Sequence, residues 1–201
     1  MKLIVITWPD FILNEAELLQ ILFEEGLEFL HLRKPGADAL QIRQLLEAIS
    51  PKWYSRIILH DHYSLVEEFR LRGVHLNQRN KSLLGTRIPF SCSCHSFQEV
   101  IRFRPAVSGY LFVSPVYDSI SKAGYQGAFT EPEIQQAIDS GIIASDVIAL
   151  GGISPHHIDQ LRSWHFGGAA VLGALWKPYL QTNDPIVLRN QFIAFKKQIS
   201  L

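Results

Sequence analysis

The chain has 201 residues, is 47% hydrophobic, and carries 19 basic and 19 acidic side chains that cancel at pH 7. This length suits one domain with a sizeable core, and the balanced charge gives no field that attracts nucleic acid or an anionic membrane. No apolar stretch approaches the roughly 18 residues of a membrane span, and the N-terminal apolar run is too short for a signal peptide. Cys92 and Cys94 alternate along one strand and favour packing in a reducing compartment. We expect a cytoplasmic protein with a single domain over residues 1–201.

Short apolar runs alternate with amphipathic segments along the chain. The expected strands are Leu3–Thr7, Leu27–Arg33, Arg56–His60, Gly73–Leu76, Pro89–Ser93, Tyr110–Val113, Val147–Leu150 and Ala169–Leu172. The expected helices are Glu15–Glu25, Ala39–Ile49 capped by Asp38, Ser64–Leu71, Ser96–Phe103, Glu131–Ser140, one that begins at Ser154-Pro155, and Asp184–Ile199. Strands that alternate with helices predict a parallel sheet with helices outside it. Eight such repeats favour a compact α/β fold, a single-domain (β/α)8 TIM barrel, over an open doubly wound sheet, which would carry a glycine fingerprint after its first strand.

Glycine follows each of the last two expected strands. Gly151-Gly152 ends the seventh strand and Gly173 ends the eighth. Because glycine lacks a Cβ, backbone N–H groups can approach a ligand closely there. In (β/α)8 barrels the loops after strands 7 and 8 commonly bind phosphate, so these ends predict a phosphate site; tight turns alone are the alternative.

Histidine gathers at the ends of four consecutive expected strands. Five of the eight histidines lie there: His31, His60, His62, His75 and His95. Barrel enzymes carry their chemistry at this rim, so the grouping predicts a functional site. Imidazoles can transfer protons near neutral pH. The set His60, His62, His75 and His95 could instead bind Zn2+ in a metal-dependent hydrolase, although no second carboxylate stands near it.

The remaining polar residues at the rim suit anions. Arg33 and Lys34 offer a planar fork and a point charge for phosphoryl oxygens. Lys122 lies in the long loop Ser114–Gly127 beside hydroxyls that can donate to phosphate. Asp61 is a hard oxygen ligand that can hold Mg2+ against a pyrophosphate. Two phosphate regions, on opposite sides of the rim, are what joining two phosphorylated halves would require.

Six segments match, in order, the motifs of one enzyme family. Its Gln-Leu-Arg-Glu-Lys, Asn-Asp-Arg and Gly-Val-His-Leu-Gly-Gln correspond to the segments His31–Pro35, His60–His62 and Gly73–Gln78. Its Ser-x-His, Gly-Pro-Val-Phe-x-Thr-x-Thr-Lys and Leu-Gly-Gly-Ile correspond to the segments Ser93–His95, Ser114–Lys122 and Leu150–Ile153. The sequence therefore resembles, along nearly its whole length, the thiamine-phosphate synthase family, which also contains the thiazole tautomerases.

The resemblance implies a transferase reaction of thiamine biosynthesis. The small-molecule substrate 4-amino-2-methyl-5-pyrimidinylmethyl pyrophosphate would lose pyrophosphate with Mg2+ as the cofactor, and a thiazole phosphate would capture the resulting carbocation. By match, the pyrophosphate would be held by Arg33, Ser93, Lys122 and neighbouring Lys34. The thiazole phosphate would be held by Ser119, Ser121, Gly152, Leu172 and Gly173, with Tyr117 as a stacking candidate. Barrels of this type are often homodimers, so a dimer is possible.

The sequence departs from the family in the pyrophosphate half. The second metal carboxylate is replaced by Asn80, which can offer Mg2+ only a neutral carbonyl beside Asp61. The Gln that reads the pyrimidine is His31, and the Asn before the metal Asp is His60. The strand 2 Lys of the family falls on Pro35.

These departures leave two alternatives to the synthase. A thiazole-phosphate tautomerase would use another rim histidine, His31, His60, His62 or His95, for proton transfer, because the tautomerases' own His falls on Pro115. A non-catalytic protein that binds thiazole phosphate or thiamine phosphate is the other.

Overall fold

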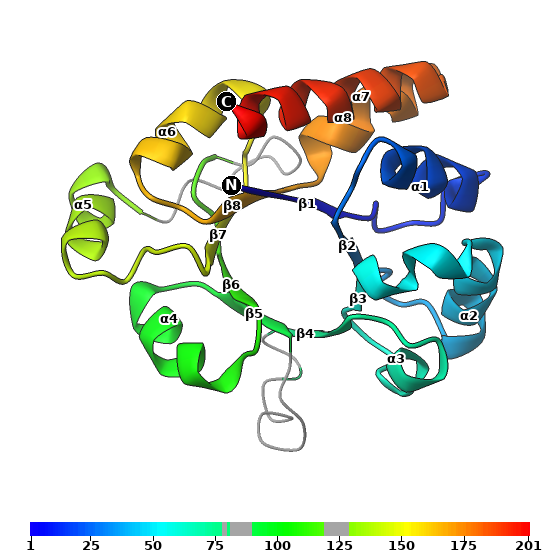
Figure 1. Ribbon diagram of the computed structural model, residues 1–201, viewed down its shortest axis with the longest axis horizontal. Helices are drawn as coiled ribbons and strands as arrows, with labels where there is room; N and C mark the ends of the chain where they lie inside the picture. The colour runs from blue at the N-terminus through cyan, green and yellow to red at the C-terminus, as the bar shows by residue number, and fades with distance from the viewer. Residues whose placement is uncertain (78–79, 81–89, 119–128) are drawn as a thin grey trace.

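The computed structural model describes residues 1–77, 80, 90–118 and 129–201 (Figure 1). Within them, eight parallel strands close a barrel in which every strand pairs with the next along the chain and β8 pairs with β1. The strands are β1 Lys2–Ile6, β2 Phe29–Leu32, β3 Ile57–Leu59, β4 Gly73–Leu76, β5 Ser91–Cys94, β6 Tyr110–Val113, β7 Val147–Leu150 and β8 Gly168–Val171. The predicted (β/α)8 barrel is confirmed, with strand ends that differ from the expected ones by a few residues.

Helices surround the barrel (Figure 1). They are α1 Glu15–Glu24, α2 Ala39–Ala48, α3 Ser64–Glu68, α4 Phe97–Phe103, α5 Glu131–Asp139, α6 Ile158–Ser163, α7 Gly173–Thr182 and α8 Pro185–Ser200. Asp38 caps α2 as predicted, because its side chain accepts the Gln41 N–H and the Gln41 side chain accepts the Asp38 N–H. None of the described helices has the length and apolarity that a bilayer span requires.

Helix α7 was not expected from the sequence. Pro178 inside it removes a backbone donor and hides the helical pattern. Packing supplies what local propensity lacks, since Leu175, Trp176 and Tyr179 are buried on one face. The Trp176 indole N–H donates to the carbonyl oxygen of Ile6 at 2.8 Å and joins α7 to β1.

Alternation along the strands sorts side chains between the barrel interior and the helices. Along β5, Cys92 and Cys94 are buried in the apolar layer beneath the helices, as predicted. Ser91 and Ser93 alternate with them and reach the ring of His75. A separate interior cluster is mainly apolar and contains Ile4, Ile6, Tyr110, Phe112, Ile148 and Ala170. The barrel interior therefore has an apolar side near β1, β7 and β8 and a hydrogen-bonded side near β2 to β6.

Candidate active site

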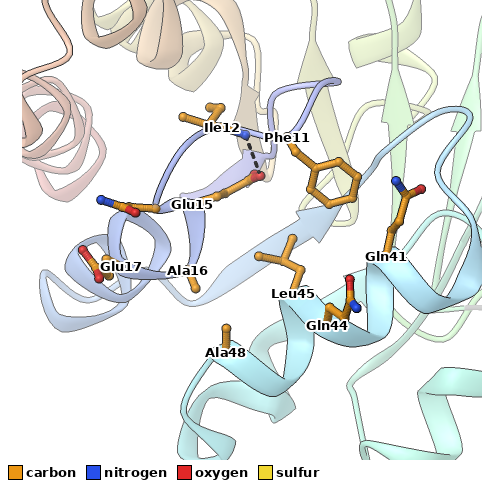
Figure 2. A pocket seen from close by; sticks show the side chains of 10 residues that line it. Phe11, Ile12, Glu15, Ala16, Glu17, Gln41, Gln44, Leu45 and Ala48 are labelled. Atoms are coloured by element: carbon orange, nitrogen blue, oxygen red, sulfur yellow. Dashed lines mark hydrogen bonds between the residues drawn. The ribbon is translucent and has the colours of Figure 1, made fainter.

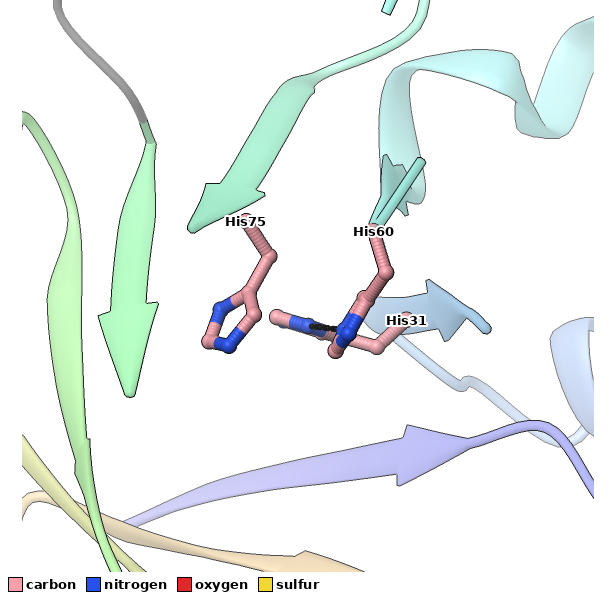
Figure 3. A group of neighbouring side chains, drawn as sticks. All are labelled: His31, His60 and His75. Atoms are coloured by element: carbon pink, nitrogen blue, oxygen red, sulfur yellow. Dashed lines mark hydrogen bonds between the residues drawn. The ribbon is translucent and has the colours of Figure 1, made fainter. Parts of the chain in front are cut away.

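Three of the predicted rim histidines converge inside the barrel. His31 on β2, His60 directly after β3 and His75 on β4 are 0%, 4% and 0% exposed. Figure 3 shows their rings pointing toward one another from adjacent strands. The Nδ1 atom of His31 lies 2.9 Å from the Nε2 atom of His60, which is hydrogen-bond distance, and the rings of His60 and His75 stack with centroids 4.2 Å apart.

Hydroxyl groups hold the outer nitrogens of this cluster. The Nε2 atom of His31 lies 2.6 Å from the hydroxyl of Tyr110. The two ring nitrogens of His75 each lie 2.8 Å from a serine hydroxyl, Ser91 at Nδ1 and Ser93 at Nε2. Sequence reasoning missed Tyr110 and Ser91, although the alternation of serine with cysteine on β5 was a signal that the serines face inward. Each of these polar contacts offsets the cost of burying an imidazole.

Burial favours the neutral form of His31 and His75. It lowers the pKa of His31 well below its ordinary value, and the nearby His75 lowers it further. Burial also lowers the pKa of His75 to about 3, with the positive charge of Arg33 as a second cause. Desolvation disfavours the charged form of an imidazole, so both shifts have the expected sign.

The other two rim histidines do not join the cluster. The Nε2 atom of His62 lies 2.7 Å from the carbonyl oxygen of Ala37, and the Nδ1 atom of His95 lies 3.1 Å from that of Ser114. The set His60, His62, His75 and His95 therefore does not form one metal site. The zinc-hydrolase interpretation required that set and is therefore wrong.

Arg33 and Ser93 lie beside the histidines. The Arg33 backbone is clamped to β1, because its N–H donates to the Thr7 hydroxyl at 2.9 Å and that hydroxyl lies 3.0 Å from its carbonyl oxygen. Arg33 is half-buried and close enough to His75 to affect its pKa. Asp61 is also half-buried and follows His60 directly. The structure thus brings three of the predicted pyrophosphate-side residues to one part of the rim.

Lys34 occupies a different environment from its neighbour Arg33. Its ammonium group is buried and lies 2.6 Å from the Glu15 carboxylate. It also donates to the carbonyl oxygens of Trp8 and Asp10 at 2.8 Å each. Burial lowers the pKa of Lys34 and raises that of Glu15, and each ion opposes the shift of the other. Lys34 therefore ties the loop after β1 to β2 and α1, and its ammonium is not presented to a substrate.

Asn80 also forms hydrogen bonds that connect neighbouring segments of the chain. Its Oδ1 accepts the backbone N–H of Asn77 at 2.7 Å. Its amide donates to the His60 carbonyl oxygen at 3.3 Å and to the Tyr63 hydroxyl. The same hydroxyl lies 3.0 and 3.1 Å from the carbonyl oxygens of His60 and His75. These contacts hold the ends of β3 and β4 together. They also engage Asn80 Oδ1, the oxygen predicted to bind Mg2+.

The glycine ends of β7 and β8 lie side by side, since Leu150 pairs with Ala170. Gly152 has φ +67°, and a Cβ there would lie 2.2 Å from the Asp118 carbonyl oxygen, so only glycine fits. Gly173 is the first residue of the ten-residue helix α7, with Leu172 at its N-cap. Unpaired N–H groups at a helix N-terminus favour anions, which agrees with the predicted phosphate site.

Tyr117 packs on the protein itself. Its ring stacks on His157 with centroids 4.0 Å apart, and its hydroxyl donates to the Gln160 side chain at 2.9 Å. Burial raises the pKa of Tyr117 to about 12. The ring is therefore already covered on one face, by the segment before α6. The predicted phosphate ligands Ser119, Ser121 and Lys122 lie outside the described residues.

A groove of about 490 Å³ lies outside the barrel, between α1 and α2 (Figure 2). Phe11, Ile12, Gln41 and Leu45 are among the residues that line it. None of the described residues predicted for the site lines this groove; Glu15, the partner of Lys34, does, and its carboxylate is already paired. The groove lies on the outer surface, beside the loop that follows β1.

Comparison with known proteins identifies the family. The family model for thiamine monophosphate synthase matches residues 3–175. The chain belongs to this family. A thiamine phosphate pyrophosphorylase from Bacteroides thetaiotaomicron has 39% sequence identity and a TM-score of 0.89, with 100% of this chain and 98% of that one covered. Thiamine-phosphate synthases from Halalkalibacterium halodurans and Helicobacter pylori are 24% and 28% identical, over 80% and 79% of this chain and 80% and 77% of theirs.

Membership of the thiamine monophosphate synthase family confirms the resemblance drawn from the six motifs. A likeness at 18% identity and TM-score 0.74, to a thiamine phosphate pyrophosphorylase from Pyrococcus furiosus, shows the shared barrel alone. Within this family fold, the chain forms the histidine cluster and the Lys34–Glu15 ion pair from its own residues.

Replacing Lys34 tests its structural role. We expect Lys34→Met to lower the free energy of unfolding by about 3–5 kcal/mol, because Glu15 would remain buried without its cation. Adding Glu15→Gln should recover part of the loss. Arg43→Met, which breaks an exposed pair with Glu68, is the matched control and should change the free energy of unfolding far less, because solvent screens that pair. Equal, small losses in urea unfolding of both single variants would contradict the assignment.

The buried imidazoles make stability depend on pH. In the unfolded chain both rings titrate near 6.5, whereas folding lowers the pKa of His75 to about 3 and that of His31 in the same direction. Below pH 6.5 the unfolded chain binds more protons, so the free energy of unfolding should fall with pH by up to about 1.4 kcal/mol per unit for each ring. Urea unfolding of metal-free protein measures this slope. His75→Gln should make it shallower by about one proton, and an unchanged slope would contradict the burial of a neutral ring.

Proposed function

We propose that this chain is a thiamine-phosphate synthase. It would couple 4-amino-2-methyl-5-pyrimidinylmethyl pyrophosphate to a thiazole phosphate, with release of pyrophosphate. The observation that carries the proposal is the match of the whole barrel, at 39% identity, to a protein named thiamine phosphate pyrophosphorylase. A cytoplasmic location and a homodimer stay predictions.

The pyrophosphate would bind at the β2–β5 side of the rim. Arg33 would present its planar fork to phosphoryl oxygens, and Ser93 would add a hydroxyl donor beside His75. One carboxylate and substrate phosphates are a common ligand set for Mg2+, so Asp61 fits this ion even though the Asn80 oxygen accepts the Asn77 N–H. Bound there, Mg2+ would neutralise the charge that develops on the departing pyrophosphate.

The thiazole phosphate would bind at the β7–β8 side. The backbone beside Gly152 and the first turn of α7, after Leu172, would donate N–H groups to its phosphate. The resemblance adds Ser119, Ser121 and Lys122. Because all eight strands are parallel in one closed barrel, their carboxyl ends meet at one mouth, and both phosphate regions would face it.

The burial of His31 and His60 argues against their use as the proton-transfer groups of a tautomerase. A tautomerase needs an accessible ring nitrogen that exchanges protons with its substrate. His31 is 0% exposed, and its two ring nitrogens contact His60 and Tyr110. His60 is 4% exposed, and its Nε2 contacts His31. In the coupling reaction the leaving group needs charge stabilisation and not a general base on this face.

A coupling assay tests the proposal. Purified full-length protein with Mg2+, the pyrimidine pyrophosphate and the thiazole phosphate should form thiamine phosphate and pyrophosphate in equal amounts. Asp61→Asn should lower kcat/KM by about 100-fold or more, and Arg33→Met by a similar factor, because each removes stabilisation of the developing charge.

The matched control for this assay is Asp139→Asn, an exposed carboxylate on α5 outside the rim. It should retain wild-type kinetics. Absence of thiamine phosphate with the wild-type protein at saturating substrates would overturn the proposal, and so would full activity in Asp61→Asn.

A further inference from the structure

The histidine cluster has the geometry of a metal site. One nitrogen of each ring, from His31, His60 and His75, lies within 4.8 Å of those of the other two. Nitrogen ligands on a tetrahedral zinc ion lie about 3.3 Å apart, as follows from Zn–N bonds of about 2.0–2.1 Å. His31 Nδ1 and His60 Nε2, at 2.9 Å, would move slightly apart. The His75 ring, which now stacks on His60 with both nitrogens at serine hydroxyls, would rotate to bring one nitrogen to the same ion. The three side chains come from neighbouring hydrogen-bonded strands or, for His60, from the residue after one, so the backbone already holds them close together.

The hydroxyls around the cluster would orient the rings as ligands. A histidine that binds a metal usually has its other ring nitrogen fixed by a hydrogen bond, which sets its tautomer and direction. Tyr110 supplies that contact to His31. Either nitrogen of His75 has a serine beside it, so whichever nitrogen takes the metal, the other stays anchored by Ser91 or Ser93.

The ligand set selects a class of ion. Three imidazoles suit zinc-like divalent transition metals, whereas Mg2+ prefers oxygen ligands. We propose that His31, His60 and His75 bind one divalent transition metal ion of the zinc class inside the barrel, at a position distinct from the Asp61 carboxylate. Three protein ligands would leave a fourth coordination position for one buried water.

Binding needs no net loss of protons. The proton shared between His31 Nδ1 and His60 Nε2 belongs to one neutral ring. It moves to the far nitrogen of that ring, which in His31 is Nε2, facing the Tyr110 oxygen. Both near nitrogens then present lone pairs to the metal. The inference does not depend on the proposed synthase reaction.

Metal titration of the chelator-treated, full-length protein tests the site. Zn2+ should bind with one equivalent per chain by equilibrium dialysis and elemental analysis, and Co2+ should give the intense visible absorption of a low-coordinate nitrogen site. His31→Gln and His60→Asn restore the residues of the family motifs and so preserve the fold. Each should weaken Zn2+ binding by at least about 100-fold, and Tyr110→Phe by about 10-fold or more.

Matched controls fix the location of the ion. His62→Asn and His95→Asn alter rim histidines outside the cluster and should leave Zn2+ affinity unchanged. Asp61→Asn should also retain the zinc equivalent while it loses synthase activity, so the two proposals can fail separately. Lack of stoichiometric Zn2+ binding would overturn the site. Wild-type affinity in His31→Gln, or zinc lost only in Asp61→Asn, would also overturn it.

Discussion

Three imidazoles enclosed in a barrel must each find hydrogen-bond partners, and this constraint shapes the interior of the barrel between β2 and β6. A buried ring nitrogen without a partner costs about 1–3 kcal/mol. Here His31 contacts His60 and Tyr110, while His75 contacts Ser91 and Ser93. These contacts link β2 through β6 across the barrel interior, opposite the apolar side chains of the remaining strands.

The two halves of the proposed site differ in the groups that would bind phosphate. On the β7–β8 side, phosphate binding would rest on backbone geometry, for which Gly152 has no substitute because of the nearby Asp118 carbonyl. On the β2–β4 side, some side chains predicted to bind the substrate instead form contacts within the protein. Lys34 neutralises Glu15 and fastens the loop after β1, and Asn80 ties β3 to β4. Among the described residues proposed for the pyrophosphate, Arg33, Ser93 and Asp61 would then remain to meet it.

The alternation of strands and helices and the glycine ends were enough to predict the barrel, because those patterns follow from local chemistry. Helix α7 was missed because Pro178 interrupts its pattern, and tertiary packing of Trp176 compensates. The rim histidines were found as a group, but which of them meet depends on strand register and side-chain direction. In the structure, Tyr110 is one of their partners, whereas His62 and His95 contact backbone carbonyl oxygens outside the cluster.

The central claim is that His31 and His75 are neutral within a buried, hydrogen-bonded cluster. Nitrogen-15 NMR of the imidazole rings in chelator-treated protein tests it most directly, since the chemical shifts report the protonation and tautomer of each ring. We predict that His31 and His75 stay neutral, with slowly exchanging N–H protons, as the pH is lowered from about 7 to about 5. Protonation of either ring over that range, in protein that remains folded, would contradict it.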